Sequence, residues 1–281
     1  MKATLITGAS GGIGEAFARR LAREKHNLVL AARSEKKLHE LCDELMLKHE
    51  ITAHYVAIDL IQTKADEHLF EETEKHGFEI EWLINNAGFG SMGDFANLDL
   101  QRELEMIELN IQSLVALTHR YLQKMRSRKS GVIINVSSTA SFQPIPFMAT
   151  YAATKAFVTS FSEAIAEENR SYGITITALC PGPTDTNFFD AANAEAFRAK
   201  GMQTAEDVVE TALSGVKKGK AHVISGWTNY IGARLGNVVP NSLITRVVGG
   251  VLRPKFERKG QIKSANDAEK NFLTDEDREK N

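Results

Sequence analysis

The sequence predicts an α/β protein built on a doubly wound, parallel, seven-stranded sheet with helices on both faces. Short apolar runs rich in β-branched residues alternate with longer segments of helical periodicity through most of the 281 residues. The short runs are apolar on both faces, as strands of a parallel sheet are when helices cover each side. We expect the strand order 3-2-1-4-5-6-7, which extends the common doubly wound order by one strand.

Seven segments are the expected strands, and six segments of helical periodicity lie between them. The expected strands are Ala3–Thr7, Asn27–Ala31, Thr52–Ala57, Trp82–Asn85, Gly131–Ser137, Thr175–Leu179 and Ala221–Ile224. The expected helices are Ile13–Glu24, Glu35–His49, Lys64–His76, Asp99–Arg126, Ala152–Arg170 and Ala205–Lys217. A single domain over residues 1–225 accounts for this alternation.

Three regions depart from the alternation. Residues 187–201 follow a Pro-Gly turn and are expected to form a small-residue-rich helix or a lid. Residues 226–260 are expected to form a helical extension that packs on the domain or on a partner subunit. Because this extension mixes aromatic residues and arginines with apolar residues, a membrane-surface helix is the alternative. Residues 261–281 are charged and polar, and we expect them to be disordered.

The composition argues against several classes of protein. A net charge of −2 provides no attraction of the whole protein to nucleic acid or to an anionic membrane. We find no uninterrupted apolar stretch of about 18 residues, so we expect no transmembrane segment. The two cysteines, Cys42 and Cys180, lie in apolar segments, and no signal peptide is evident, so a reducing, cytoplasmic location is expected. The eight histidines show no ligand spacing, and we predict no metal site.

The turn after the first expected strand predicts a dinucleotide site. It reads Thr-Gly-Ala-Ser-Gly-Gly-Ile-Gly at Thr7–Gly14. Glycine lets the backbone turn tightly and approach a ligand, and the free N–H groups at the start of the next helix then face an anion. A glycine motif alone is a weak signal, but this one lies between a strand and a helix, where phosphate binding requires it. The expected contacts are Gly8, Ser10, Gly12, Ile13 and Gly14.

The end of the second expected strand indicates which dinucleotide binds. An acidic residue about 20 residues past the glycines would bond the ribose 2′-hydroxyl of NAD. No acid is present there, and Arg33 follows instead. Because a guanidinium can hold a 2′-phosphate in a forked contact, we expect NADP(H) to be preferred over NAD(H). The alternative is that Arg33 merely opens the next helix, and no second basic residue lies within the glycine motif.

Tyr151 and Lys155 lie four residues apart near the start of an expected helix, so their side chains share one face. The ammonium favours the phenolate, so we expect the pKa of Tyr151 to fall from about 10 towards working pH. Such a phenol can give a proton to an alkoxide or take one from an alcohol. An isolated pair is more often a tyrosine packed beneath a solvated lysine stem, so its meaning depends on the other motifs.

These motifs together resemble the short-chain dehydrogenases/reductases, in their short single-domain form, over about residues 2–225. The matching positions, in order, are Thr7–Gly14, Asp59, Asn85–Gly88, Asn110, Asn135–Ser138, Tyr151 with Lys155, and Pro181–Thr186. The resemblance implies a Rossmann fold, a nicotinamide cofactor and a reversible hydride transfer to a carbonyl or from a secondary alcohol. It also implies a homodimer or homotetramer formed through the two long helices.

The resemblance implies a catalytic set of Asn110, Ser138, Tyr151 and Lys155. Ser138 would polarise the substrate oxygen, and it is preferred over Ser137 because the family's serine usually lies 13 residues before the tyrosine. Tyr151 would deliver the proton, and Lys155 would lower its pKa and hold the nicotinamide ribose. Asn110 would position a water that connects Lys155 to solvent; from the residues alone it marks a kink, a water site or an exposed amide.

The remaining cofactor contacts follow the third, fourth and sixth expected strands. They are Asp59 and Leu60 near the adenine, the turn of Asn86, Ala87 and Gly88, Pro181 and Gly182 beside the nicotinamide, and Thr186 on its carboxamide with Thr184 as competitor. Two alternatives remain open. One is that Asp59 serves only as a turn cap, and the other is that Asn86 only ties neighbouring strands together.

The expected substrate pocket is apolar. Its candidate walls, each of which is otherwise an ordinary core residue, are Phe89, Met92, Phe142, Ile145, Phe147, Phe188 and Phe189. We therefore expect bulky or hydrophobic carbonyl compounds to be preferred over small hydroxy acids. Two alternative functions are a reductase of carrier-bound 3-oxoacyl chains and a non-catalytic NADP(H)-binding regulator, because a fold does not determine a function.

Overall fold

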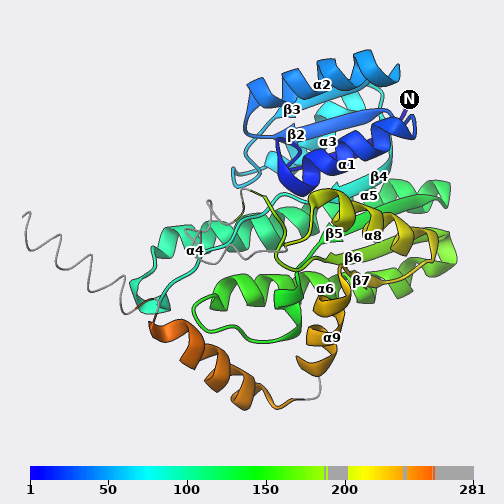
Figure 1. The fold of residues 1–281 in the computed structure, drawn as a ribbon. Coiled ribbons are helices and arrows are strands. Elements are labelled where there is room, and N and C mark those ends of the chain that lie inside the picture. Colours follow the sequence, from blue (N-terminus) through cyan, green and yellow to red (C-terminus); the bar gives the residue numbers. More distant parts are fainter. Residues whose placement is uncertain (187, 189–201, 237–238, 255, 257–281) are drawn as a thin grey trace, which may run out of the picture.

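The structure is a computed structural model that describes residues 1–186, 188, 202–236, 239–254 and 256. At its centre is one sheet of seven parallel strands in the order β3-β2-β1-β4-β5-β6-β7 (Figure 1). The predicted fold and strand order are therefore confirmed. The strands are β1 (Lys2–Thr7), β2 (Leu28–Ala32), β3 (Ala53–Ala57), β4 (Glu79–Asn85), β5 (Gly131–Val136), β6 (Ile174–Cys180) and β7 (His222–Ile224).

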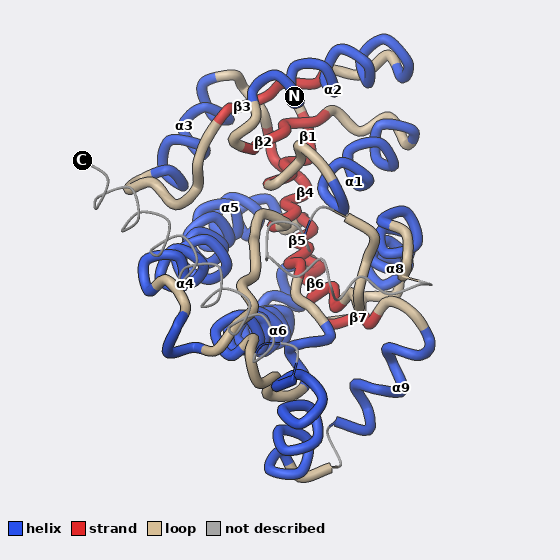
Figure 2. Tube along the Cα trace, turned by 60° about the vertical axis from the view of Figure 1, so that its left-hand side comes forward, coloured by secondary structure: helices blue, strands red, loops and turns tan. Residues whose placement is uncertain are grey.

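Helices cover both faces of the sheet (Figure 2). Leu5 and Ile6 are adjacent in β1 and fully buried, but they belong to the two different apolar clusters, because strand side chains alternate between faces. The Ile6 face packs against α1 (Gly12–Arg23), α2 (Glu35–His49) and α8 (Ala205–Lys217). The Leu5 face packs against α3 (Ala65–Lys75), α5 (Leu114–Arg128) and α6 (Ala149–Asn169).

The long helix expected over Asp99–Arg126 is not a uniform α-helix. It consists of α4 (Leu100–Ile107), a π-helical stretch η2 (Glu108–Ser113) and α5. Asn110 lies in the π-helical stretch, so the expected irregularity at this residue is confirmed. Stretches of this kind often occur at functional sites, because the wider turn moves one side chain out of its helical register.

The C-terminal extension is helical over most of its described residues, as expected. Its first helix is α9 (Trp227–Gly236), and a second helix spans residues 241–254.

The short 3₁₀ turns elsewhere are η1 (Phe95–Asn97), η3 (Thr139–Phe142) and η4 (Arg170–Tyr172). Among the residues that the structure describes, no helix is long and apolar enough to cross a membrane. The segment 187–201, expected to form a helix or a lid, lies outside the described residues except for Phe188, and the expected disordered tail at 261–281 lies outside them entirely.

Candidate active site

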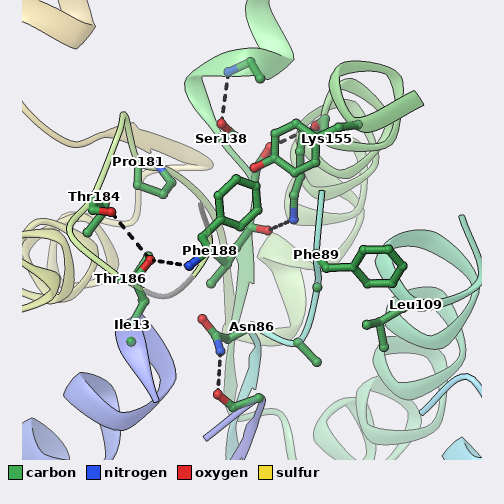
Figure 3. Close-up of a pocket in the computed structure, with 18 of the residues that line it drawn as sticks. Ile13, Asn86, Phe89, Leu109, Ser138, Lys155, Pro181, Thr184, Thr186 and Phe188 are labelled. Atoms are coloured by element: carbon green, nitrogen blue, oxygen red, sulfur yellow. Dashed lines mark hydrogen bonds between the residues drawn. The ribbon is translucent and has the colours of Figure 1, made fainter. Parts of the chain in front are cut away.

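A cleft of about 1040 Å³ opens at the carboxyl ends of the strands, where doubly wound sheets bind their ligands. Figure 3 shows part of its lining. Seventeen predicted site residues line it: Gly8, Ser10, Gly12, Ile13, Arg33, Asp59, Leu60, Asn86, Ala87, Gly88, Ser138, Tyr151, Lys155, Pro181, Gly182, Thr184 and Thr186. Gly14 and Asn110 do not line it.

The glycine turn forms one wall of the cleft. Gly8 and Gly12 have φ angles of 65° and 56°, a conformation that other residues adopt only with strain. α1 begins at Gly12 without any side chain capping its first N–H groups. These groups are therefore available to an anion, and the turn fits a phosphate. Gly14 has a packing role instead, because a methyl group there would collide with the carbonyl oxygen of Gly8.

Asn86 ties the turns after β1 and β4 together. Its side-chain Nδ2 donates to the carbonyl oxygens of Thr7 (2.9 Å) and Gly8 (3.2 Å). The backbone N–H groups of Asn86 and Ala87 each donate to Thr7 Oγ1 at 3.0 Å. The structural role that the sequence left as an alternative is thus present, and the same turn also lines the cleft. Asn86 therefore holds the glycine turn in its shape.

Two cations lie at the end of the cleft beyond the glycine turn. Arg33 follows β2 and is exposed, and Lys37 lies one helical turn further along, in α2. The sequence prediction did not include Lys37, although the spacing of four residues was a usable signal. Asp59 also lines this end, and its carboxylate accepts a hydrogen bond from Ile61 N at 3.2 Å, so it caps its own turn as the alternative expected.

Tyr151 and Lys155 lie in α6 with exposures of only 7% and 6%. Lys155 Nζ donates to the carbonyl oxygen of Val136 at 2.9 Å and lies 5.8 Å from the centre of the Tyr151 ring. Burial raises the pKa of Tyr151 to about 12, and a hydrogen bond with Ser138 lowers it by less. Burial also lowers the pKa of Lys155 to about 8.

The expected fall in the pKa of Tyr151 is therefore wrong for this structure. Burial raises the pKa of Tyr151 by more than the hydrogen bond with Ser138 lowers it, and Lys155 directs its ammonium at a β5 carbonyl. Tyr151 is consequently a neutral phenol at neutral pH. It can donate a proton or a hydrogen bond without first having to acquire a proton from solvent.

The two serines after β5 point to different places. Ser137 Oγ donates to the carbonyl oxygen of Lys155 at 2.9 Å and lies 2.7 Å from Thr159 Oγ1, so its hydroxyl is directed at α6. Ser138 caps the η3 turn, where its Oγ accepts from Ala140 N at 3.1 Å, and it also bonds Tyr151. Ser138 is thus the serine whose hydroxyl lies with the tyrosine, as predicted.

Asn110 is 1% exposed and lies behind the cleft. Its Nδ2 donates to the carbonyl oxygen of Phe89 (3.0 Å) and to Thr154 Oγ1 (3.1 Å), and its Oδ1 accepts from Phe89 N at 3.2 Å. Asn110 therefore holds the turn after β4 against α6, which carries Lys155. The alternative of an exposed amide is excluded, and the water relay stays a prediction.

Four of the expected apolar walls line the cleft: Phe89, Met92, Ile145 and Phe188. Phe142 and Phe147 do not, and that part of the prediction is wrong. Phe142 packs near His222, with ring centres 6.1 Å apart, and Phe147 has a φ of 66° that turns its ring onto Phe256. Phe189 lies outside the described residues.

Helix α9 forms a wall that the sequence prediction missed. Thr228, Asn229, Gly232 and Ala233 of this helix line the cleft, as do Leu109 and Met148. Asn229 Nδ2 donates to the carbonyl oxygen of Ser225 at 2.8 Å, which fixes the start of α9 beside β7. Helix α9, the first part of the C-terminal extension, therefore packs on the domain and lines the cleft.

The segment after β6 closes the cleft opposite α1. Thr184 is buried, and its hydroxyl donates to the carbonyl oxygen of Gly182 at 2.9 Å, within its own turn. Thr186 lies across from Gly12, where an added methyl group would come within 3.2 Å of its side chain. Thr186 thus faces the phosphate end of the cleft more directly than Thr184, and its bond to a carboxamide stays a prediction.

Comparisons with known proteins agree with this arrangement. The sequence matches the family described as short chain dehydrogenase over residues 2–196. 17-beta-hydroxysteroid dehydrogenase type 3 of Mus musculus is 34% identical over 225 residues, covering 76% of this chain and 69% of that protein. Very-long-chain 3-oxoacyl-CoA reductase-A of Danio rerio is 31% identical over 276 residues, covering 93% of this chain and 81% of that protein.

Solved structures show the same likeness. The short-chain dehydrogenase from Sphingobium yanoikuyae in complex with NADPH has a TM-score of 0.76 and is 29% identical, covering 84% of this chain and 94% of that one. The likeness thus extends over most of both chains.

Proposed function

The chain belongs to the short-chain dehydrogenase family, and we propose on this basis that it is an NADP(H)-dependent oxidoreductase of hydrophobic ketones and secondary alcohols. The observation that supports the proposal most is the grouping of Ser138, Tyr151 and Lys155 at one end of a cleft whose other end fits a dinucleotide phosphate. A protein that only bound the dinucleotide would have no need of this group.

The nicotinamide dinucleotide, when bound, supplies or takes up the hydride. In the reducing direction, Ser138 donates a hydrogen bond to the carbonyl oxygen and polarises it. Tyr151, which burial keeps protonated, then transfers its proton to the oxygen on which negative charge develops. In the oxidising direction the same oxygen returns the proton to the phenolate. Lys155 carries the positive charge that stabilises this phenolate and is proposed to hold the nicotinamide ribose.

The preference for NADP(H) rests on two cations. Arg33 and Lys37 both line the cleft beyond the glycine turn, where the 2′-position of an adenosine ribose would lie. A phosphate there can form a forked bond with the guanidinium and a second contact with the ammonium. The NADPH bound to the Sphingobium yanoikuyae relative supports the same preference.

The substrate class rests on the apolar end of the cleft. Phe89, Met92 and Phe188 line the cleft. Phe89 and Phe188 pack against the apolar cluster that contains Tyr151, and the ring of Phe188 lies 5.3 Å from that of Tyr151. When a substrate buries a large apolar body there, each methylene group removed from water makes the free energy of binding more favourable. The name of the mouse relative indicates a steroid substrate, which has such a body.

A second candidate is the reduction of 3-oxoacyl thioesters. It is favoured by the likeness to the zebrafish very-long-chain 3-oxoacyl-CoA reductase, which extends over 93% of this chain. Both candidates use the same cleft and the same three catalytic side chains, and they differ only in what extends from the keto group.

We also propose that the chain forms a homo-oligomer through α4 and α6. Large apolar side chains are exposed on these helices, including Leu100 at 65%, Leu104 at 50% and Phe157 at 41%. A partner subunit that covers them would remove this apolar surface from water.

A panel of carbonyl compounds assayed with NADPH and with NADH tests the function. It contains a steroid ketone, an aromatic ketone, a 3-oxoacyl thioester and a small polar ketone. We expect the highest kcat/KM with NADPH on the bulky ketones or, for the second candidate, on the thioester. Efficient turnover of the small polar ketone alone would contradict the proposed pocket. Tight NADPH binding without any turnover of a carbonyl or an alcohol would favour a regulator.

A further inference from the structure

Three side chains that can bind a metal ion converge at the sheet edge formed by β3, outside the cleft. His54 lies in β3, Glu72 lies in the last turn of α3, and His76 caps the end of that helix. Ligand atoms of all three lie within 4.8 Å of one another. No metal site was predicted from the sequence, because Glu72 and His76 form a ligand set only together with His54, which β3 contributes.

The fold explains why the three side chains meet. Val56 packs with Leu69 of α3 in the core, and strand side chains alternate, so His54, two residues before Val56, faces α3 as well. Glu72 and His76 are four residues apart and share one face of that helix. The imidazole rings of His54 and His76 lie 4.2 Å apart at an angle of 35°.

The ring of His76 is held in place by its own helix. Its Nδ1 lies 2.9 Å from the carbonyl oxygen of Glu72, and metal-binding histidines are commonly held by such a bond.

We propose that His54, Glu72 and His76 bind a divalent first-row transition ion of the zinc class. Two imidazole nitrogens and one carboxylate oxygen are a ligand set that zinc favours, whereas magnesium and calcium prefer oxygen ligands alone. Water completes the coordination. The ion joins α3 to the first half of β3, at the end of the strand opposite the cleft, so its role is to hold the sheet edge and not to take part in turnover.

Titration of the full chain, prepared without a histidine tag and freed of metal, tests the site. We expect one equivalent of Zn²⁺ to bind, and Co²⁺ at the same site to give the visible absorption of a cobalt ion with nitrogen ligands. The affinity should fall at least about 100-fold in His54→Ala, since the loss even of a residue that merely supports a ligand costs about 10- to 100-fold. His119→Ala, which removes an exposed histidine of α5, is the matched control and should bind as the wild type does.

A second variant concerns the lysine that competes with the metal. Lys75 Nζ lies 3.0 Å from Glu72 Oε1 in an exposed ion pair. Lys75→Gln should therefore bind Zn²⁺ more tightly than the wild type, and Zn²⁺ should raise the melting temperature of the wild type but not that of His54→Ala. A Zn²⁺ stoichiometry well below one, or equal affinities in wild type and His54→Ala, would overturn the proposal.

Discussion

The two ends of the cleft are built in different ways. At the nucleotide end, backbone N–H groups of the glycine turn and exposed cations such as Arg33 and Lys37 face the ligand. At the end where we propose that the reaction takes place, Tyr151 and Lys155 are almost fully buried, and burial shifts the pKa of both. The first end can recognise charge without holding it in an apolar environment. The second end depends on that environment.

This difference indicates how each end should respond to change. An exposed cation contributes to the affinity for one charged group of a ligand, so its removal should alter the choice of cofactor and little else. A buried catalytic group acts only when charge develops in the transition state, so its removal should lower kcat and leave cofactor binding intact. The following predictions test that separation, beginning with the largest effect.

Ser138→Ala should lower kcat by about 100- to 1,000-fold, which is the usual cost of losing one donor to a developing oxyanion. The dissociation constant of NADPH should be nearly unchanged. Steady-state kinetics with a bulky ketone and fluorescence titration with NADPH provide the two measurements. Ser160→Ala, which removes an exposed hydroxyl of α6, is the control and should retain full turnover. If Ser138→Ala weakened NADPH binding as strongly as it lowered kcat, the separation of the two ends would be wrong.

The double variant Arg33→Ala/Lys37→Ala should raise the KM for NADPH by about 10- to 100-fold, the range expected for charge-assisted bonds. The KM for NADH should change little, because NADH has no 2′-phosphate. Lys36→Ala is the control, since Lys36 is an exposed cation of the same helix that pairs with Glu40. An equal rise in KM for both cofactors would mean that these cations do not bind the 2′-phosphate.

Phe188→Ala should lower kcat/KM for a bulky ketone by about tenfold, since an apolar contact in a substrate pocket contributes about 1–3 kcal/mol. Phe142→Ala should have little effect on that ratio, because this ring lies near His222 and outside the cleft. Competition between a bulky and a small ketone in one assay measures the difference. The pocket assignment fails if Phe142→Ala shows the larger loss.

The smallest effect concerns stability. The pKa of Lys155 is lowered from 10.5 to about 8 in the folded chain, so between these values the unfolded chain binds the proton more tightly. The free energy of unfolding therefore rises with pH across that window and does not depend on this titration below it. Between about pH 7.5 and about pH 9.5, the free energy of unfolding of the wild type should rise by about 2 kcal/mol relative to that of Lys155→Met. Urea unfolding of both proteins at both pH values measures this gain, and an equal change in the two proteins would contradict the lowered pKa of Lys155.

The sequence alone predicted the sheet and most of the cleft. This was possible because most of the candidate site residues follow strands, and the carboxyl ends of parallel strands meet at one edge. Arg33, Asp59 and Ser138 were assigned to the cleft by position along the chain, and each of them lies there. Asn110 was recognised as an irregular point of its helix, but its place behind the cleft required the π-helical register of η2.

Features that depend on distant packing were not predictable. α9 lines the cleft only because the chain returns there after β7, and no local pattern in Trp227–Gly236 indicates that return. Phe142 and Phe147 are aromatic like pocket walls, but the ring of Phe142 lies near His222, and Phe147, with a φ of 66°, stacks on Phe256. The pKa of Tyr151 was predicted with the wrong sign because spacing reveals a neighbouring charge and does not reveal the depth of burial.

The most direct test of the separation between the two ends is a paired measurement on Tyr151→Phe. NADPH binding is followed by fluorescence, and turnover of a bulky ketone is followed with the same preparation. We predict that the dissociation constant of NADPH is retained and that turnover falls by about 100-fold or more, as for the loss of a general acid. Turnover comparable to that of the wild type would show that Tyr151 is not the proton donor and would contradict the account.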